Sequence, residues 1–305
     1  MEAVALRGGI DPPARGGRER LLERLRSVPA GTGLLVVSAP AGYGKTVLLA
    51  QLARDADVPV AWIGLRPAHR DPRRLMAEIG EALSVAAPLA GSPVLLVLDD
   101  LDHIAVPEAL EAVSAFLADL PAGARVALGC RADAGLLLGR RLVEGGLTRL
   151  TADDLAFDTP EAETLMASAG VGLAPDALAE VLRRTEGWPA GLRLAALRIG
   201  GRPDPAARAR AFAGDDRTVA AYLHEVMLAG LPPDALTFLT RTSVLEPIGG
   251  DLCDAVLQTS GSARRLEDLQ RSNLLLVALD AHGERYRYHH LLRDLLRREM
   301  RRREP

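Results

Sequence analysis

The feature that most constrains this chain is a glycine-rich turn between an apolar segment and a predicted helix. Residues 39–46 have the sequence Ala-Pro-Ala-Gly-Tyr-Gly-Lys-Thr and directly follow the apolar residues 34–37. This sequence fits the phosphate-binding loop pattern, except that Ala39 stands where glycine is usual. A predicted buried strand before the loop and a predicted helix over residues 46–54 supply the required context. The chain is therefore expected to contain a P-loop NTPase core.

The residue types of this loop have separate physical roles. Backbone amides in such a loop point inward and cradle phosphate oxygens. Gly42 and Gly44 allow backbone angles and a close approach that a side chain would block. The helix that follows directs the positive end of its dipole at the anion. We expect Lys45 to contact the β- and γ-phosphates and the Thr46 hydroxyl to bind Mg²⁺.

Composition also singles out Lys45. Of the 37 lysines and arginines, residue 45 is the single lysine, so the other 36 are arginines. Arginine is a rigid planar fork, whereas lysine is a compact charge on a flexible stem. The sequence therefore indicates that position 45 requires the shape of lysine, with retention by chance as the alternative.

Acidic residues at the end of an apolar run complete the predicted catalytic site. Residues 94–98 are apolar, and Asp99 and Asp100 follow them directly. Asp99 is expected to hold Mg²⁺ directly or through water. Asp100 is then placed to orient or deprotonate an attacking water. The alternative is that the two acids cap the next turn.

Arg131 is a further catalytic candidate. It follows a predicted strand over residues 125–129 and, at a strand tip, would face the ligand crevice of an α/β sheet. There it would sense the γ-phosphate. In a chain so rich in arginine, a solvated loop arginine is the alternative.

The order of predicted elements indicates an α/β fold with additional domains. Strands alternate with helices up to about residue 155, which implies a parallel sheet with crossover helices. Helices alone follow from Thr159-Pro160 to about residue 199. A Gly/Pro linker at 200–205, helices from about residue 216, strands at 273–279 and 285–289, and a closing helix suggest a winged-helix-like module. We predict a flexible leader (1–17), a P-loop NTPase core (18–155), a helical lid domain (156–205) and a winged-helix-like domain (206–305).

Several segments resemble a known family. Residues 186–192, Glu-Gly-Trp-Pro-Ala-Gly-Leu, are similar to a segment of MalT-type regulators, the large ATP-binding LuxR-family proteins within the STAND class of signalling ATPases. The phosphate loop with its initial alanine is similar too. Further similar segments lie in the same order at residues 98–100, 222–226, 252–256 and 286–296. The resemblance covers nearly the whole chain from about residue 18.

The resemblance implies an ATP/ADP-binding switch that uses Mg²⁺. ADP would hold a closed resting state, and ATP with an unknown inducer would permit self-association; slow hydrolysis would reset the switch. ATP rather than GTP rests on the resemblance alone. The nucleotide would be bound by the phosphate-loop residues Ala39, Pro40, Ala41, Gly42, Tyr43, Gly44, Lys45, Thr46 and Val47.

Three residues outside the loop are implied to approach the nucleotide. Pro189 would lie near the base, although a purely structural helix-turn-helix at 187–189 is the alternative. His289, favoured over His290, would touch the β-phosphate of ADP, or else pack at the junction of hairpin and helix. Arg18 would approach the adenine edge.

Composition narrows the class of protein. A net charge of −3 gives no general attraction to nucleic acid, and two cysteines exclude a disulfide scaffold. No apolar run approaches the roughly 20 residues of a membrane span, and no signal peptide is apparent, so a cytoplasmic location is expected.

Two alternative functions remain open. The first is a P-loop phosphotransferase or constitutive ATPase. The second is a nucleic-acid-binding module that uses the arginine-rich residues 293–303, although Asp294 and Glu299 interrupt that run. The resembling regulators usually continue into a helical-repeat sensor and a DNA-binding helix-turn-helix. This chain stops at Pro305, so DNA contact is expected only through a domain absent from it, and the chain is either a fragment or a stand-alone module.

Overall fold

The computed structural model describes residues 18–26, 33–87, 92–120, 123–131, 136, 143–272 and 275–303. Two compact units are present. The first contains the residues up to Ala39 and Gly44–Leu155, and the second contains Pro40–Tyr43 and the residues from Ala156 onward. The predicted leader, residues 1–17, lies outside the described residues.

The first unit is built on a parallel sheet of five strands in the order β2-β3-β4-β1-β5. The strands are β1 (Leu34–Ser38), β2 (Val60–Gly64), β3 (Val94–Asp99), β4 (Ala124–Cys130) and β5 (Leu147–Leu150). β1 and β4 confirm the strands predicted at residues 34–37 and 125–129, and β2 and β3 continue the predicted alternation of strands and helices. We did not predict β5, because it is a four-residue edge strand in which Thr148 and Arg149 interrupt the apolar run.

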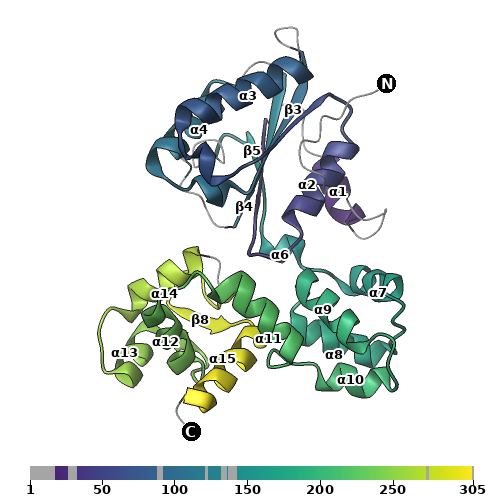
Figure 1. Ribbon diagram of the computed structural model, residues 1–305, viewed down its shortest axis with the longest axis vertical. Helices are drawn as coiled ribbons and strands as arrows, with labels where there is room; N and C mark the ends of the chain where they lie inside the picture. Colours follow the sequence, from purple (N-terminus) through teal and green to yellow (C-terminus); the bar gives the residue numbers. More distant parts are fainter. Residues whose placement is uncertain are drawn as a thin grey trace. The chain divides into compact units, whose positions relative to one another are not determined.

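Helices cover both faces of this sheet, which explains why β1 and β3 are buried along their whole length. Leucine and valine side chains from alternate strand positions pack against α3 (Pro72–Ala86) and α4 (Pro107–Ala118). α2 (Lys45–Arg54), with α1 (Glu19–Arg26) beside it, lies on the other face (Figure 1). The short elements of this unit are η1 (Pro67–Arg70), η2 (Leu101–Ile104) and α6 (Ala152–Leu155).

The strand register brings the predicted site residues of this unit to one edge. Ser38 at the end of β1 is level with Cys130 of β4, and Gly64 at the end of β2 is level with Asp99 of β3. Because all five strands are parallel, the loops that follow them leave at the same edge. The start of α2, the Asp99–Asp100 pair and Arg131 therefore belong to one end of the sheet.

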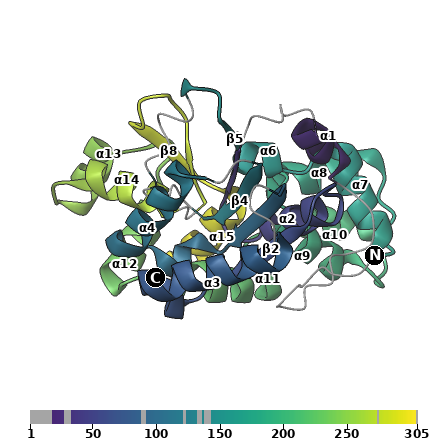
Figure 2. The same ribbon diagram turned by 90° about the horizontal axis from the view of Figure 1, so that it is seen from above.

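The second unit is mostly helical, as Figures 1 and 2 show. Its helices are α7 (Thr159–Ser168), α8 (Pro175–Thr185), α9 (Pro189–Ile199), α10 (Pro205–Ala211), α11 (Arg217–Leu223), α12 (Pro233–Thr242), α13 (Gly250–Leu257), α14 (Ser262–Arg271) and α15 (His290–Arg303). A π-helical turn, η3 (His224–Leu228), continues α11. The predicted absence of strands between residues 159 and 199 is confirmed.

Proline and acidic caps explain where several of these helices begin. Asp158 accepts a hydrogen bond from the Glu161 N–H, while the Glu161 side chain accepts from the Asp158 N–H, so α7 begins with a capping box. The linker predicted at residues 200–205 is too long by one residue, because α10 begins at Pro205 with Asp204 as its N-cap. An acidic residue followed by a proline is typical of a helix start, and a helix forms here although the segment is rich in proline.

A small antiparallel sheet in the order β6-β8-β7 completes the second unit. The strands are β6 (Ile248–Gly249), β7 (Leu276–Ala278) and β8 (Arg285–Tyr288). The predicted hairpin of two strands before the last helix is thus confirmed. β6 consists of only two residues, too few for a strand pattern to be visible in sequence.

Gly129 of β4 provides a test of how tightly the sheet edge is packed. A Cβ at position 129 would lie 2.3 Å from Asp99 Oδ1 and 2.9 Å from Leu49 Cδ1. We expect Gly129→Ala to lower the free energy of unfolding of the first unit by about 1–3 kcal/mol through overpacking. Gly64→Ala is the matched control, because a Cβ there meets nothing within 4 Å. Urea denaturation followed by circular dichroism measures both, and equal effects would contradict the packing argument.

Candidate nucleotide-binding site

The phosphate loop ends at the start of α2, where the Lys45 side chain is hydrogen-bonded within the loop. Gly44, with φ 79°, is the N-cap of α2, a backbone conformation that glycine adopts without strain. The Lys45 ammonium donates a hydrogen bond of 2.8 Å to the Ala39 carbonyl across the base of the loop. Only 8% of Lys45 is exposed, and this burial lowers the pKa of its ammonium group. Lys45 is thus a buried cation at the start of a helix, where an anion would be stabilised.

The two predicted Mg²⁺ ligands lie close to each other. The Thr46 hydroxyl is near enough to the Asp99 carboxylate to favour its charged form, and the Asp100 N–H donates a hydrogen bond to Asp99 Oδ1 at 3.0 Å. Asp99 is 3% exposed, and burial raises the pKa of its carboxyl group. A hydroxyl beside a buried carboxylate is an oxygen donor set that suits Mg²⁺, which takes its remaining ligands from phosphate and water. These residues therefore fit the ion that the fold implies.

The Asp100 and Arg131 backbones border this pair. Asp100 has φ 60°, and its carbonyl accepts from the His103 N–H at the start of η2. The Arg131 N–H donates to both oxygens of Asp102, at 2.9 and 2.8 Å. The roles predicted for Asp100 and Arg131 stay predictions.

Asp102 is a residue of this edge that the sequence analysis missed. After burial, which lowers the pKa of Lys45, the strongest influence is the carboxylate of Asp102, which raises it. Asp102 therefore acts on Lys45 electrostatically more than Asp99 or Asp100 does. The signal was a third aspartate, two residues after the predicted pair.

Arg18 lies beside the phosphate loop within the first unit. It is buried, and one guanidinium nitrogen donates to the Leu155 carbonyl at 2.6 Å. The other terminal nitrogen is 3.3 Å from the place where a Cβ on Gly44 would be. Arg18 therefore connects the loop end of α2 to the end of α6. Its predicted contact with the adenine edge stays a prediction.

The apex of the loop, Pro40–Tyr43, packs within the second unit. The Trp188 indole N–H donates to the Ala41 carbonyl at 3.0 Å, and the Ala190 N–H donates to the Gly42 carbonyl at 3.1 Å. Pro189 is the first residue of α9 between these two donors. Its predicted position near the base stays a prediction, as does the contact predicted for Val47, which lies half-buried on α2.

His289 is held by backbone groups on both ring nitrogens. Nε2 lies 2.8 Å from the Thr185 carbonyl, and the Leu291 N–H donates to Nδ1 at 3.2 Å. The histidine is 1% exposed, and burial lowers the pKa of its imidazole. His289 is therefore neutral with the hydrogen on Nε2, and to touch a β-phosphate it would have to release Thr185. Its nucleotide role stays a prediction.

Glu186 forms an ionic cluster that the sequence analysis did not predict. It ends α8 with φ 50° and accepts two parallel hydrogen bonds of 2.7 Å from Arg287 of β8. His290 contributes its backbone N–H at 2.9 Å and Nδ1 at 2.6 Å to the same carboxylate oxygen. Burial alone would raise the pKa of Glu186, but the hydrogen bonds from Arg287, the nearby His289 and the backbone N–H of His290 lower it to about 2.

Three of the arginines of α15 are already engaged with protein groups. Arg293 pairs with Glu246, Arg297 donates to the Ser243 carbonyl at 3.0 Å, and Arg298 donates to the Asp215 carbonyl. These contacts weaken the case for a nucleic-acid surface on this helix, because a groove for phosphates needs guanidinium groups that face solvent.

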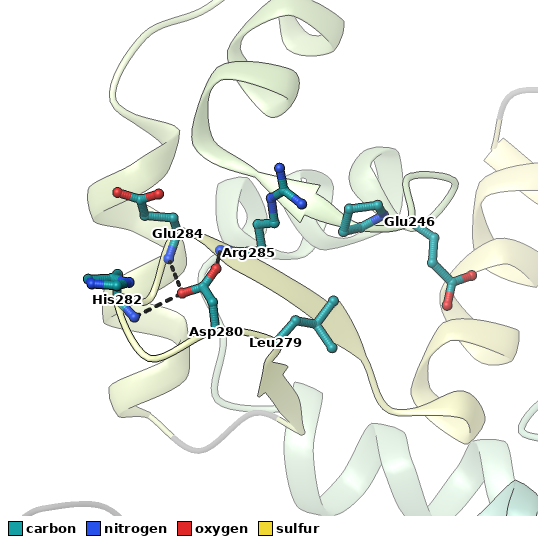
Figure 3. Close-up of a pocket in the computed structure, with 7 residues that line it drawn as sticks. Glu246, Leu279, Asp280, His282, Glu284 and Arg285 are labelled. Carbon is teal, nitrogen blue, oxygen red and sulfur yellow. Dashed lines mark hydrogen bonds between the residues drawn. The ribbon is translucent and has the colours of Figure 1, made fainter.

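A shallow cavity of about 500 Å³ lies elsewhere, at the β7–β8 turn (Figure 3). Asp280 organises this turn by accepting hydrogen bonds from the backbone N–H groups of His282, Glu284 and Arg285. No predicted site residue lines this cavity. Within the described ranges there is no cluster of three or more His, Cys, Asp or Glu side chains suited to a metal ion. Nor is any described helix long and apolar enough to cross a bilayer.

The Glu186 cluster gives a prediction for stability against pH. The pKa of Glu186 is lower in the folded protein than its ordinary value of 4.5, so its stabilising effect is complete above about pH 4.5. The effect is lost as the pH falls towards about 2. We expect Glu186→Gln to lower the free energy of unfolding by about 2–3 kcal/mol at pH 7, with the difference from wild type shrinking below pH 4.5. Arg287, His289 and His290 are the titratable and charged groups that face it.

Glu180→Gln is the matched control for this experiment. Glu180 pairs with Arg183 and Arg184 one turn away on the surface of α8, where such pairs contribute less than about 1 kcal/mol. Denaturant titrations at pH 7, 5, 4 and 3 compare the two variants with wild type. A Glu186→Gln deficit that stays constant down to pH 3 would contradict the assignment.

Comparisons with known proteins agree with this arrangement. The MalT winged helix domain description matches residues 223–305. The serine/threonine-protein kinase PknK of Mycobacterium tuberculosis is 30% identical over 320 aligned residues, which cover 93% of this chain and 29% of the kinase. The HTH-type transcriptional regulator MalT of Yersinia enterocolitica is 28% identical over 315 residues, covering 92% of this chain and 34% of MalT.

A solved structure supports the fold. A Walker-type ATPase of Pyrococcus abyssi superposes with a TM-score of 0.64 over 92% of this chain and 95% of its own, at 14% identity. The chain thus spans about a third of the length of the relatives that it matches in sequence, and nearly all of this structural neighbour. Its α/β core has the fold of this Walker-type ATPase, residues 223–305 match the MalT winged helix domain, and over nine-tenths of its length the chain is similar in sequence to MalT.

Proposed function

We propose that this chain is a nucleotide-dependent switch that binds ADP or ATP with Mg²⁺, hydrolyses ATP slowly, and serves a transcriptional regulator. The observation that carries the proposal is the start of α2, where the buried Lys45 donates to the Ala39 carbonyl and the Thr46 hydroxyl lies beside the buried Asp99 carboxylate. The similarity to MalT proteins, which are HTH-type transcriptional regulators, supports the regulatory role. An inducer, self-association in the ATP state and a cytoplasmic location belong to the same proposal.

Each residue of the first unit would have a defined task. Lys45 would exchange its hydrogen bond to the Ala39 carbonyl for phosphate oxygens, so that nucleotide binding replaces an internal contact. Thr46 and Asp99 would hold Mg²⁺, which when bound neutralises charge on the transferred phosphoryl group. Asp100 would orient the attacking water, and Arg131 would stabilise charge at the γ-phosphate. Such a switch works only if the nucleotide binds its two conformations with different affinities.

The bound nucleotide tests this proposal. We expect the purified protein, once denatured and separated by anion exchange, to release close to one equivalent of ADP. An ADP-locked resting state would keep its nucleotide through purification, whereas a constitutive ATPase or phosphotransferase would not. An empty protein that turns over ATP rapidly without a partner would contradict the proposal.

Substitutions at Lys45 test the site itself. We expect Lys45→Ala to weaken ADP binding at least a hundredfold in titration calorimetry, because a buried cation beside the phosphates is removed. Lys45→Arg should fail as well, since the guanidinium is planar and larger than the ammonium that fits behind the Ala39 carbonyl. Arg54→Ala, an exposed position at the other end of α2, is the control and should bind normally. Unchanged affinity in Lys45→Ala would refute the site.

Asp100 separates binding from hydrolysis. We expect Asp100→Asn to slow ATP hydrolysis by roughly 10²–10⁴-fold, the usual contribution of a general base, while ADP affinity changes less than about threefold. Asp119→Asn, an exposed aspartate at the end of α4, is the matched control. Phosphate release in single-turnover experiments measures the rate. An Asp100→Asn variant with wild-type turnover would leave Asp100 as a cap of η2 only.

A further inference from the structure

The apex of the phosphate loop is held by hydrogen bonds to its carbonyl groups. Residues 40–43 pack with the second unit, where the Trp188 indole bonds to the Ala41 carbonyl and the Ala190 N–H bonds to the Gly42 carbonyl. Ala190 is the second residue of α9, so its N–H is one of the helix-start donors that have no partner within the helix. Two consecutive carbonyl groups of the loop therefore face the start of α9.

The two hydrogen bonds to the loop carbonyls also determine the direction in which the loop N–H groups point. In a trans peptide the carbonyl and the N–H point in opposite directions. With the Ala41 and Gly42 carbonyls turned towards α9, the N–H groups of Gly42 and Tyr43 point the other way. A phosphate cradle needs its N–H groups aligned and its carbonyl oxygens turned out, because carbonyl oxygens repel anions. The two hydrogen bonds thus select the peptide orientation that an anion requires.

The indole donor is itself rigid. Trp188 is fully buried, and its ring packs against Tyr222 and His289 with centroid separations of 5.8 Å each. Its backbone N–H donates to the Thr185 carbonyl at 2.8 Å. Gly187, with φ 71°, places its carbonyl on the Phe157 N–H at 2.8 Å. The indole nitrogen is therefore held in place before any ligand arrives.

The loop is shaped to receive this contact. A Cβ on Gly42 would lie 2.6 Å from Ala190 Cβ and 2.8 Å from the Trp188 indole nitrogen. Both separations are shorter than side-chain carbon atoms tolerate. Glycine at position 42 therefore allows Trp188 and Ala190 to pack closely against the loop. It also adopts the left-handed backbone conformation, with φ 80°, without strain.

We propose that Trp188 is a positioning residue for the nucleotide phosphates: its indole N–H, together with the Ala190 N–H, holds the Ala41–Gly42–Tyr43 backbone in the anion-binding orientation. This inference rests on the proposed function and adds to it a residue that touches the loop rather than the ligand. Breaking the indole bond frees the Ala41–Gly42 peptide to rotate and turn a carbonyl towards the phosphates.

Trp188→Phe removes the indole N–H and retains an aromatic ring. We expect this variant to bind ADP about tenfold more weakly in titration calorimetry, the effect of one lost hydrogen bond at a preorganised site. Inorganic pyrophosphate should lose affinity by the same factor, because the defect lies in the phosphate cradle. A general defect of the lid helices would instead weaken ADP more than pyrophosphate. Trp62→Phe, the same change at the chain's other tryptophan, on β2, should bind within twofold of wild type.

The outcomes separate this inference from the proposed function. If wild type binds ADP, Lys45→Ala does not, and Trp188→Phe binds within twofold of wild type, the role of Trp188 is refuted and the proposed function stands. If wild type binds neither ADP nor ATP, the proposed function fails and this inference fails with it. Circular dichroism shows whether Trp188→Phe has folded.

A second measurement avoids any change at position 188. The Trp62→Phe protein has a single indole, so its N–H resonance belongs to Trp188. We expect this proton to exchange with solvent slowly and to shift when ADP is added. An indole proton that exchanges at the rate of a free tryptophan, or that does not respond to ADP, would overturn the proposal even if Trp188→Phe failed to fold.

Discussion

The closeness of the Thr46 hydroxyl to the buried Asp99 carboxylate is the constraint around which the candidate site of the first unit is built. It joins the start of α2, which follows β1, to the end of β3, although β4 lies between these two strands. This closeness is possible because Gly129 of β4 has no side chain where the carboxylate lies, with Asp99 Oδ1 2.3 Å from the place of a Cβ. The strand order, the lack of a side chain at Gly129 and the burial of Asp99 together allow the Thr46 and Asp99 oxygens to lie close to each other.

Sequence alone predicted this part of the fold because its signals are strong and local. Strands buried on both faces are continuous apolar runs, and a lysine in a glycine-rich turn after such a run has few other interpretations. β5 was not predicted because an edge strand, which here pairs with β1, needs no long apolar run. Arg149 interrupts the few apolar residues that β5 has. α10 was not predicted because the Asp204-Pro205 pair that begins it lies in a segment rich in glycine and proline, which we interpreted as a linker.

The contacts that distant residues make could not be predicted in the same way. Trp188 and Ala41 are separated by 147 positions, and the acceptor is a backbone carbonyl that every residue type has. The Ala190 bond is invisible for the same reason, since both partners are backbone groups. Glu186 and Arg287 carry opposite charges, but in a chain with 40 acidic and 37 basic residues charge alone selects no pair. Only the resemblance to a family marked the segment around Trp188.

The turn between α8 and α9 connects two parts of the second unit through neighbouring residues. Glu186 binds Arg287 and His290, at the end of the small sheet and the start of α15, while Trp188 binds the Ala41 carbonyl at the apex of the phosphate loop. Gly187 lies between them with φ 71°, and its carbonyl accepts a hydrogen bond from the Phe157 N–H. The three residues of this turn, 186–188, therefore bring together contacts with β8, with α15 and with the phosphate loop.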